Sequence, residues 1–323
     1  VGTGEVNSSR SSYAGIGLLL SEDGGKSWKN MGLSDAHHIS KIMINPNNPD
    51  EVVVSAVGHL YSKNNERGVY KTIDGGASWN KTLFVNDETG IIEMDVDPNN
   101  WNLMYAAAWD KDRKAWNFRG NGNASAIYKS TDAGNTWTKV TVAGSGFPVG
   151  EGVGRIGLAV VDANTVYAIH DNQFRRKDEK KKETNDGMLL KHDFKTMTTA
   201  QFMGLDNNRL KTYLTQNGFQ EKYTAESVKE MVKSGKAKPV DLARYLEDAN
   251  TLLFDTPVIG AEVYKSTDGG KNWKKTHEGY LDGIYFSYGY YFGKIHVDPN
   301  NADKIYIYGV PILKSADGGK TFE

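Results

Sequence analysis

The sequence contains no cysteine among its 323 residues, which excludes a disulfide framework and cysteine metal ligands within them. An excess of one charge is also absent, because 39 basic residues face 40 acidic ones and the net charge is −1. Such a balance creates no global field that would favour nucleic acid or an anionic lipid surface. No apolar run approaches the roughly 20 residues of a membrane helix. We therefore expect no nucleic-acid partner and no membrane span within these residues.

Signatures of cofactor chemistry are missing as well. The sequence has no phosphate-binding loop, no dinucleotide-binding glycine pattern and no nucleophile turn. His37 and His38 stand together without a third ligand at a recognisable spacing. Asp110 is followed too closely by basic residues to begin a calcium loop. The sequence therefore predicts neither a metal site nor a cofactor.

One short turn motif, in contrast, occurs five times. It reads S/T-x-D-x-G-x-S/T-W, with Asn272 and Phe322 as departures, and four of the seven tryptophans occupy its last position. An Asp carboxylate accepts backbone N–H groups across a tight turn, glycine supplies the positive φ, and flanking hydroxyls bond the same turn. The final aromatic residue begins the next strand. The five structural aspartates are Asp23, Asp74, Asp132, Asp268 and Asp317.

Each motif belongs to a longer unit of four short strands. A strand such as Gly68-Val69-Tyr70-Lys71 precedes the motif, and further upstream two strands flank a proline-asparagine turn such as Asp97-Pro98-Asn99-Asn100. The first such turn is expected over residues 45–50, with a strand over 51–56. Successive motif aspartates are 51, 58, 136 and 49 residues apart. Four-stranded units of about 50 residues in series predict the blades of a β-propeller, because one such sheet cannot bury both its faces alone.

These motifs resemble the Asp-box repeats of sialidases, xyloglucan-cleaving hydrolases and the sortilin family. The whole unit, including Val1-Gly2-Thr3-Gly4-Glu5 and Arg67-Gly68-Val69-Tyr70-Lys71, is most similar to the sortilin-like bacterial exoproteins often labelled glycosyl hydrolases. The resemblance covers nearly the whole chain and implies an extracellular or cell-envelope location. It carries no catalytic set that transfers residue by residue. Since only about four complete blades fit this length, further domains of the same protein are expected.

The interval of 136 residues between the third and fourth motifs holds an insertion. Helical signals cover residues 206–217 before Gly218, residues 224–234 before Gly235, and a segment that Pro239 opens and that runs to about Phe254. We expect an all-β fold of four-stranded antiparallel propeller blades with Asp-box hairpins. The blades occupy 1–171 and 258–323, the first and last being partial, and a small α-helical insertion occupies 172–257 within one blade.

Strand order indicates which loops vary. In a four-stranded blade, the links between strands 1 and 2 and between strands 3 and 4 share one face, which therefore carries the proline-asparagine turns and the Asp boxes. The links between strands 2 and 3 and between blades lie on the opposite face, where loops differ from blade to blade. We expect the ligand site on that opposite face, away from the Asp boxes.

Aromatic and charged residues alternate in these variable loops, which are expected to include residues 58–67 and 109–119. The pattern suits an oligosaccharide, whose ring faces stack on aromatic side chains, and suits an extended peptide almost equally. The ligand-binding candidates are His59, Tyr61, Arg67, Trp109, Arg113, Trp116, Arg119, Arg155, Tyr285 and Tyr288.

Two functions remain open from the sequence, a binding propeller and a glycoside hydrolase. Hydrolysis usually requires two carboxyl groups, about 5–5.5 Å apart for retention or about 6.5–9.5 Å for inversion. In a sialidase-like alternative, an arginine cluster would hold a substrate carboxylate. The same charges also suit salt bridges within the loops. The lack of a reaction motif favours the binding propeller. The catalytic candidates are Asp110, Asp112, Glu151 and Glu5.

Overall fold

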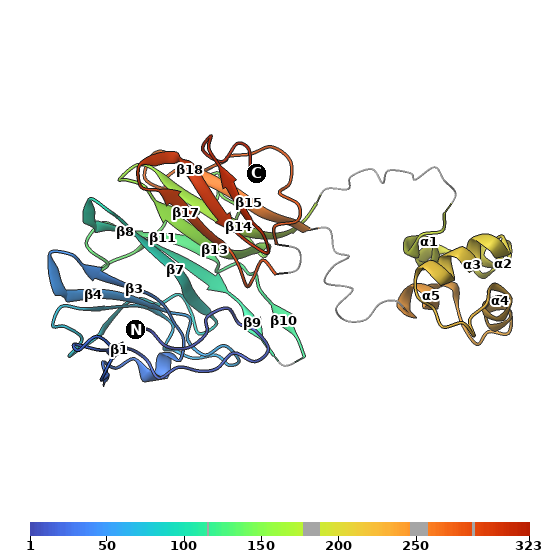
Figure 1. Cartoon of the computed structure of the whole chain (residues 1–323), viewed down its shortest axis with the longest axis horizontal. Coiled ribbons are helices and arrows are strands. Elements are labelled where there is room, and N and C mark those ends of the chain that lie inside the picture. The colour runs from blue at the N-terminus through green and yellow to red at the C-terminus, as the bar shows by residue number, and fades with distance from the viewer. Residues whose placement is uncertain (115, 177–187, 246–257, 286–287) are drawn as a thin grey trace. The chain divides into compact units, whose positions relative to one another are not determined.

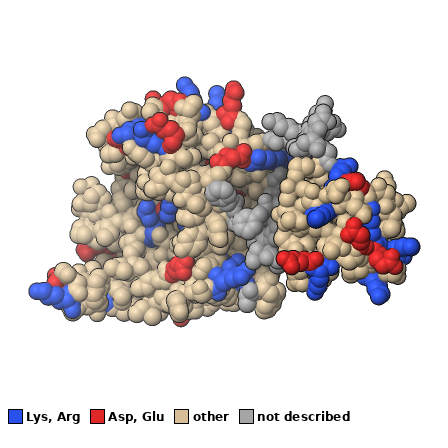
Figure 2. All heavy atoms as spheres, turned by 45° about the vertical axis from the view of Figure 1, so that its right-hand side comes forward, with Lys and Arg blue, Asp and Glu red and all other residues tan. Residues whose placement is uncertain are grey.

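The computed structural model describes residues 1–114, 116–176, 188–245, 258–285 and 288–323. The chain divides into two compact units, one formed by Val1–Arg175 with Val258–Glu323 and the other by Arg176–Pro257. In their described parts the first unit is built of strands and the second of helices (Figure 1). Figure 2 shows basic and acidic side chains interspersed on the visible surface, as the near-zero net charge requires.

Besides one short two-stranded hairpin, five antiparallel sheets follow one another along the described part of the first unit, coloured from blue to red in Figure 1. The first pairs β1 (Leu19–Leu20) with β2 (Lys29–Asn30). The next three sheets each have four strands. The second sheet contains β3 (Ile39–Asn45), β4 (Asn48–Ala56), β5 (Gly68–Thr72) and β6 (Asn80–Leu83), and the third contains β7 (Thr89–Asp97), β8 (Asn100–Asp110), β11 (Ala126–Ser130) and β12 (Thr138–Lys139). The fourth contains β13 (Val153–Val160), β14 (Val166–Arg175), β15 (Val258–Ser266) and β16 (Lys274–Lys275). The fifth contains β17 (Lys294–Asp298), β18 (Asn301–Tyr308) and β19 (Ile312–Ser315). Strands that are consecutive within a sheet pair with each other, which is the arrangement of a propeller blade.

Apolar side chains fill the spaces between successive sheets. The first strands make many of these contacts, since β7 touches β3 and β13, and β13 touches β17. Strand β8 is buried throughout its central part and reads as an almost continuous apolar run. The clusters between sheets contain Val53 with Met94, Trp109 with Ile156, and Ile169 with Ile295. Each four-stranded sheet therefore buries both faces against its neighbours, which explains why the units occur in series.

The five Asp boxes share one hydrogen-bond geometry. Oδ1 of each aspartate accepts the backbone N–H of the fourth residue on at 2.9–3.0 Å, and Oδ2 accepts that residue's side-chain donor at 2.6–2.7 Å. The hydroxyl two residues before the aspartate donates to Oδ1 at 2.6–2.9 Å. Bonds from Ser27 and Ser78 lower the pKa of Asp23 and Asp74 to about 2. The carboxylates are therefore committed to their own turns.

The tip of an Asp box is tied to the first hairpin of its own sheet. In the second sheet the Gly75 N–H donates to the carbonyl oxygen of Asp50 at 3.0 Å, and in the fifth Gly318 donates to Asp303 at 2.8 Å. The third and fourth sheets have the same bond, from Ala133 to Asn102 and from Gly269 to Asn164. The Asp boxes and the proline-asparagine turns therefore lie at one end of the sheets, which confirms that part of the sequence prediction.

Two strands are longer than the sequence predicts. Strand β4 starts at Asn48, because Asn45 pairs with Asn48 across a two-residue turn, and Pro49 lies in the strand before pairing with β5 begins at Val52. Strand β8 continues to Asp110, since β7 pairs with it as far as Thr89. The expected loop of residues 109–119 is instead the end of β8 followed by a hairpin of β9 (Asp112–Arg113) and β10 (Phe118–Arg119).

The helical unit has its own apolar core. It contains α1 (Lys191–Thr196), α2 (Thr199–Met203), α3 (Asn207–Gln216), α4 (Ala225–Lys233) and α5 (Pro239–Tyr245), of which the sequence missed α1 and α2. The side chains of Asp206 and Thr224 cap α3 and α4 by accepting backbone N–H groups. The expected continuation of the last helix beyond residue 245 lies outside the described residues. Its buried core includes Phe194, Phe202, Leu210, Tyr213, Leu214, Val228, Val232 and Leu242.

Candidate functional site

Loops from several sheets meet at the end opposite the Asp boxes. We call this surface the loop face, which comprises residues 5–16, 57–67, 109–125 and 280–293, without 115, 286 and 287. Tyr61 Oη donates to the carbonyl oxygen of Ser9 at 2.9 Å, so the first two segments touch. The rings of Phe118 and Tyr290 lie 4.6 Å apart, which joins the last two. Residues far apart in the sequence therefore form one surface.

Three of the predicted aromatic residues are accessible on the loop face. Trp116, in the turn of the β9–β10 hairpin, is 85% exposed, Tyr288 is 46% exposed and Tyr61 is 39% exposed. The ring of Tyr288 lies 6.3 Å from that of Tyr290, so it adjoins the contact with Phe118. Exposed rings offer flat apolar surfaces that stack on other flat groups. These three side chains are therefore available to a ligand.

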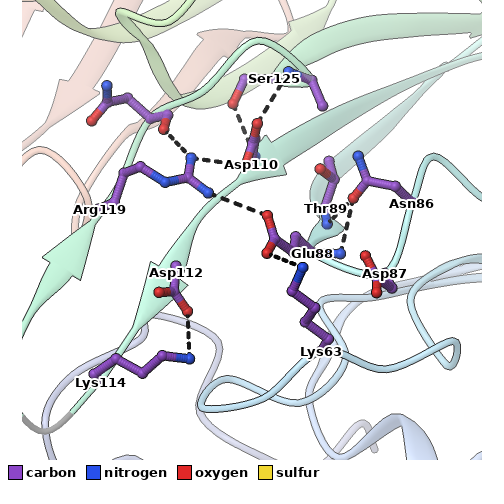
Figure 3. Close-up of polar contacts among 12 residues, drawn as sticks. Lys63, Asn86, Asp87, Glu88, Thr89, Asp110, Asp112, Lys114, Arg119 and Ser125 are labelled. Carbon is purple, nitrogen blue, oxygen red and sulfur yellow. Dashed lines mark hydrogen bonds and ion pairs between the residues drawn. The ribbon is translucent and has the colours of Figure 1, made fainter.

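Several charged residues of this face form ion pairs, with one another or with Glu88, which precedes β7 (Figure 3). Arg119 Nη1 lies 2.9 Å from Oδ1 of Asp110, and Arg119 Nη2 lies 3.6 Å from Oε2 of Glu88. Lys63 Nζ lies 2.7 Å from Oε1 of Glu88 and lowers the pKa of that carboxyl. Asp112 is paired with the next-but-one residue, Lys114, at 3.0 Å. Asp110 and Asp112 are therefore each paired with a cation.

The other two catalytic candidates have separate surroundings. The backbone carbonyl of Glu151 accepts a hydrogen bond from Asn121, and the backbone N–H of Glu5 donates to Tyr13 at 3.4 Å. Neither carboxylate has a hydrogen bond or ion pair with another described residue. The structure thus gives no contact that joins Glu5 or Glu151 to the carboxylates of the β8–β9 region.

Arg67 and Trp109 differ from expectation because both are buried. The guanidinium of Arg67 donates to the backbone carbonyls of Val57 at 2.7 Å and Asp87 at 2.9 Å, and also to those of His59 and Ser62. Trp109 is fully buried, and its Nε1 donates to the carbonyl of Gly120 at 2.8 Å. Both side chains therefore fix the backbone of the loop face by hydrogen bonds and are not accessible to a ligand in this structure.

Arg155 and Tyr285 are buried as well, beneath the tyrosine-rich segment 280–293. Arg155 Nη1 donates to Oδ1 of Asn7 at 2.7 Å and to the carbonyl of Tyr291 at 2.9 Å. Burial raises the pKa of the nearby Asp171 to about 6, although Arg155 acts in the opposite direction. Tyr285 is 2% exposed. The predicted contact of Arg155 and Tyr285 with a ligand is therefore replaced by a role in fixing the loop that carries Tyr288.

His59 lies at the edge of the loop face beside other histidines. Its ring stacks on that of His37 with centroids 3.8 Å apart, and its Nε2 lies 3.0 Å from the carbonyl oxygen of Asp35. The adjacent His38 is buried, and burial lowers its pKa to about 4. Within the described residues, no group of three or more histidine, aspartate or glutamate side chains is placed to hold a metal ion.

A groove of about 660 Å³ lies on the Asp-box face, between the fourth and fifth boxes. Its lining includes Asp268, Asp317, Lys274 and Lys320. We expected the ligand site on the opposite face, and this groove is a cavity on the Asp-box face that the sequence did not predict. Residues of two successive box hairpins line the groove, and the two aspartates bond within their own turns. Its side chains free to meet a ligand are therefore mainly lysines.

A second cavity, of about 350 Å³, lies between the first strands of the sheets. The buried Glu93 of β7 contacts Lys41 of β3 at 3.4 Å and is also paired with Lys294 of β17. Burial raises the pKa of the neighbouring Asp95 and lowers that of Lys294. Sequence reasoning missed this cluster as a unit. The available signal is Glu93 and Asp95, two of the three acids in the mainly apolar strand β7, at alternate positions that share one face.

The sequence matches two family models. The Sortilin-Vps10 model, described as sortilin, neurotensin receptor 3, matches residues 17–234, and the BNR/Asp-box repeat model matches residues 264–275. No curated protein matches the chain. Among the described residues, no helix combines the length and apolar character needed to cross a bilayer.

Several solved structures are partly similar to the chain. A GH74 xyloglucanase from Xanthomonas campestris is 14% identical with a TM-score of 0.48, and the match covers 94% of this chain and 34% of that one. YCF48 from Cyanidioschyzon merolae is 9% identical with a TM-score of 0.42, covering 88% and 55%. An α-L-arabinanase from Penicillium chrysogenum is 10% identical with a TM-score of 0.35, covering 87% and 64%. The chain spans about a third of the xyloglucanase, and with TM-scores below 0.5 these likenesses identify no activity.

Proposed function

Because the chain belongs to the Sortilin-Vps10 family, we propose that it is part of an extracellular or cell-envelope β-propeller that binds an extended glycan on its loop face. The observation that carries this proposal is the convergence of loops from several sheets around the exposed rings of Trp116, Tyr288 and Tyr61. Rings on separate loops suit a ligand that extends across the surface and presents one flat sugar face after another.

Binding is favoured over hydrolysis by the state of the carboxylates. Asp110 forms an ion pair with Arg119, and Lys63 lowers the pKa of Glu88 and so stabilises the ionised form of that carboxyl. A glycosidase needs one carboxyl group that keeps its proton near neutral pH and faces a second one across the scissile bond. Among the described residues, burial raises the pKa of Asp95, which lines the cavity between the first strands, and of Asp171, which is buried beneath Gly289, the residue after Tyr288.

The direct test compares two exposed tryptophans on opposite faces. Trp116→Ala removes a ring from the loop face, and Trp28→Ala removes a 49% exposed ring from the first Asp box. A glycan array with the unmodified chain identifies a ligand, and calorimetry then measures its Kd for each variant. We expect Trp116→Ala to weaken binding about 10-fold, the upper end of an aromatic contact, and Trp28→Ala to leave Kd unchanged.

Three results would contradict this proposal. Equal loss of affinity in both tryptophan variants would mean that the loop face is not the site. Loss of affinity on Lys320→Ala instead would place the ligand in the Asp-box groove. A reducing-end assay that detects turnover by the unmodified chain, abolished in Asp110→Asn, would make the protein a hydrolase. Binding to peptides, with no binding to any glycan, would show that the ligand of the loop face is a peptide.

A further inference from the structure

Arg113 is a buried cation that lacks an anionic partner. It belongs to β9 and is 6% exposed, and its Nε is buried without a hydrogen-bond acceptor. Its guanidinium makes no hydrogen bond or ion pair with any other residue in the described ranges. The guanidinium carbon instead lies 4.7 Å from the ring centroid of Phe118 and 6.0 Å from that of Tyr290. The side chain is therefore positioned by aromatic contacts alone.

The other buried arginines show how unusual this state is. Arg67 donates to four backbone carbonyls, and Arg155 donates to one side chain and two carbonyls. Burying a charged group without compensating hydrogen bonds is unfavourable, and burial lowers the pKa of Arg113. Arg67 and Arg155 therefore have acceptors within the chain, whereas the guanidinium of Arg113 keeps its donors for an acceptor from outside it.

The surroundings of Arg113 favour a negative ligand group. The neighbouring carboxylate, Asp112, is already paired with Lys114 at 3.0 Å. Arg10 lies close enough for its positive charge to act on Arg113, and Tyr61 and Tyr290 are the other polar groups that influence it. Tyr61 is itself partly exposed on the loop face. The locality is thus an aromatic setting with an excess of positive charge.

We propose that Arg113 is an anion-binding subsite of the loop face and that the glycan bound there carries acidic groups, either carboxylates or sulfates. This inference rests on the proposed glycan binding. The planar guanidinium can donate two parallel N–H bonds to a carboxylate or sulfate. Trp116 lies in the same hairpin and Tyr288 lies beside Tyr290, so adjoining sugar rings have exposed surfaces on which to stack.

The experiment uses matched acidic and neutral ligands. Oligogalacturonate is compared with its neutral methyl ester, and a sulfated galactan oligosaccharide with its desulfated form, so that the two anionic groups are tested separately. Calorimetry is performed with the full 323-residue chain, with Arg113→Met, which keeps an apolar stem, and with Arg113→Lys, which keeps the charge. We expect Arg113→Met to weaken binding of one acidic ligand about 10- to 100-fold, while Arg113→Lys retains part of the affinity.

A thermal unfolding curve separates this role from a purely structural one. Because Arg113 has no hydrogen-bond or ion-pair partner among the described residues, and methionine can keep its contact with Phe118, Arg113→Met is expected to unfold at the same or a higher temperature than the parent chain. The acidic ligand is expected to raise the unfolding temperature of the parent chain and not that of Arg113→Met. A lower unfolding temperature for Arg113→Met, with equal loss of acidic and neutral ligands, would overturn the inference.

The proposed function and this inference fail in different ways. If the neutral glycans bind, Trp116→Ala weakens them and Arg113→Met has no effect on any ligand, then the loop face binds glycans and the anionic subsite is wrong. If no glycan of either kind binds, or only acidic peptides bind, both ideas are wrong.

Discussion

Trp79 Nε1 donates a hydrogen bond to the carbonyl oxygen of Met31 at 2.8 Å, and so joins the second sheet to the segment that follows the first. Trp137 does the same one sheet later, since its Nε1 lies 3.2 Å from Oγ1 of Thr82. In these two Asp boxes the aspartate closes a hairpin, and the tryptophan attaches that hairpin to the preceding sheet. Trp273 of the fourth box differs, since its Nε1 donates to the carbonyl of Gly270 within the box. Trp28, the equivalent residue of the first box, makes no such bond with any described residue.

Replacing Trp79 by phenylalanine removes the indole donor and keeps an aromatic ring. We expect Trp79→Phe to lower the free energy of unfolding by about 1 kcal/mol, because the Met31 carbonyl loses its partner. Trp28→Phe is the matched control and should change stability by less than about 0.5 kcal/mol, the usual range for surface sites. Urea unfolding followed by circular dichroism measures both. Equal effects would mean that the indole bond contributes nothing.

The Asp boxes predict a specific acid sensitivity. The pKa of Asp74 is about 2 when folded because Ser78 and Thr72 donate to its carboxylate, whereas an unfolded aspartate titrates near about 4. The stabilisation is therefore complete above about pH 4 and is lost as the pH falls through about 2. Asp74→Asn should reduce stability at pH 7 and reduce its dependence on pH between 4 and 2. Urea unfolding at pH 7, 4 and 3 tests this.

Asp50→Asn is the control for that experiment. Its carboxylate accepts no hydrogen bond from a described residue, although its backbone carbonyl accepts one from Gly75. The substitution should leave the pH dependence of unfolding unchanged. If both variants lose the same stability at all three pH values, the Asp74 carboxylate is not the acid-sensitive group.

Asp171 predicts the opposite dependence on pH. Burial raises its folded pKa to about 6, against an unfolded value near about 4. Ionising this group therefore destabilises the fold, with no effect below about pH 4 and the full effect above about pH 6. Asp171→Asn should raise the free energy of unfolding at pH 8, by at most about 3 kcal/mol, and the gain should shrink at pH 5. Glu151→Gln, which changes a carboxylate without a described partner, should show neither change.

The helical unit is expected to unfold separately from the sheets, because it has its own core. Phe202 is fully buried there, so Phe202→Ala should destabilise this unit by about 3–5 kcal/mol. Calorimetry should show a lower temperature for the helical transition and an unchanged one for the sheets. Lys211→Ala, at an exposed position of α3, should shift neither. A joint shift of both transitions would show that the two units unfold as one.

Local hydrogen bonds explain how much of this fold could be predicted. The Asp-box turns and the caps of α3 and α4 depend on residues within a few positions of one another, such as Asp74 with Ser78 and Thr224 with Ser227. Their sequence patterns therefore predict their structures. Helices α1 and α2 are too short to show a helical period, and Phe194 and Phe202 pack them into the shared core. The capping box of Thr198 with Gln201 is a local signal for α2 that the sequence analysis did not use.

The candidate site was less predictable because its geometry depends on contacts between distant segments. The sequence does not distinguish an arginine that donates to backbone carbonyls from one that has no hydrogen-bond acceptor. Arg67 is of the first kind and Arg113 of the second. Only the meeting of Phe118 with Tyr290 gives Arg113 its aromatic surroundings. The burial of Trp109 was equally hard to predict. It belongs to a strand because β8 pairs with β7 at this position, whereas the charged residues that follow it in the sequence indicate a loop.

Strands β14 and β15 remain paired on both sides of the inserted helices, from Val166 with Ser266 to Arg175 with Val258. Adjacent strands are about 4.8 Å apart, so the excursion leaves and re-enters the sheet at almost the same point. The insertion is therefore attached to the sheet at a single place. Another domain whose two termini lie equally close should be able to replace the helices without disturbing the pairing of β14 with β15. This position therefore suits the insertion of an engineered sensor or reporter domain.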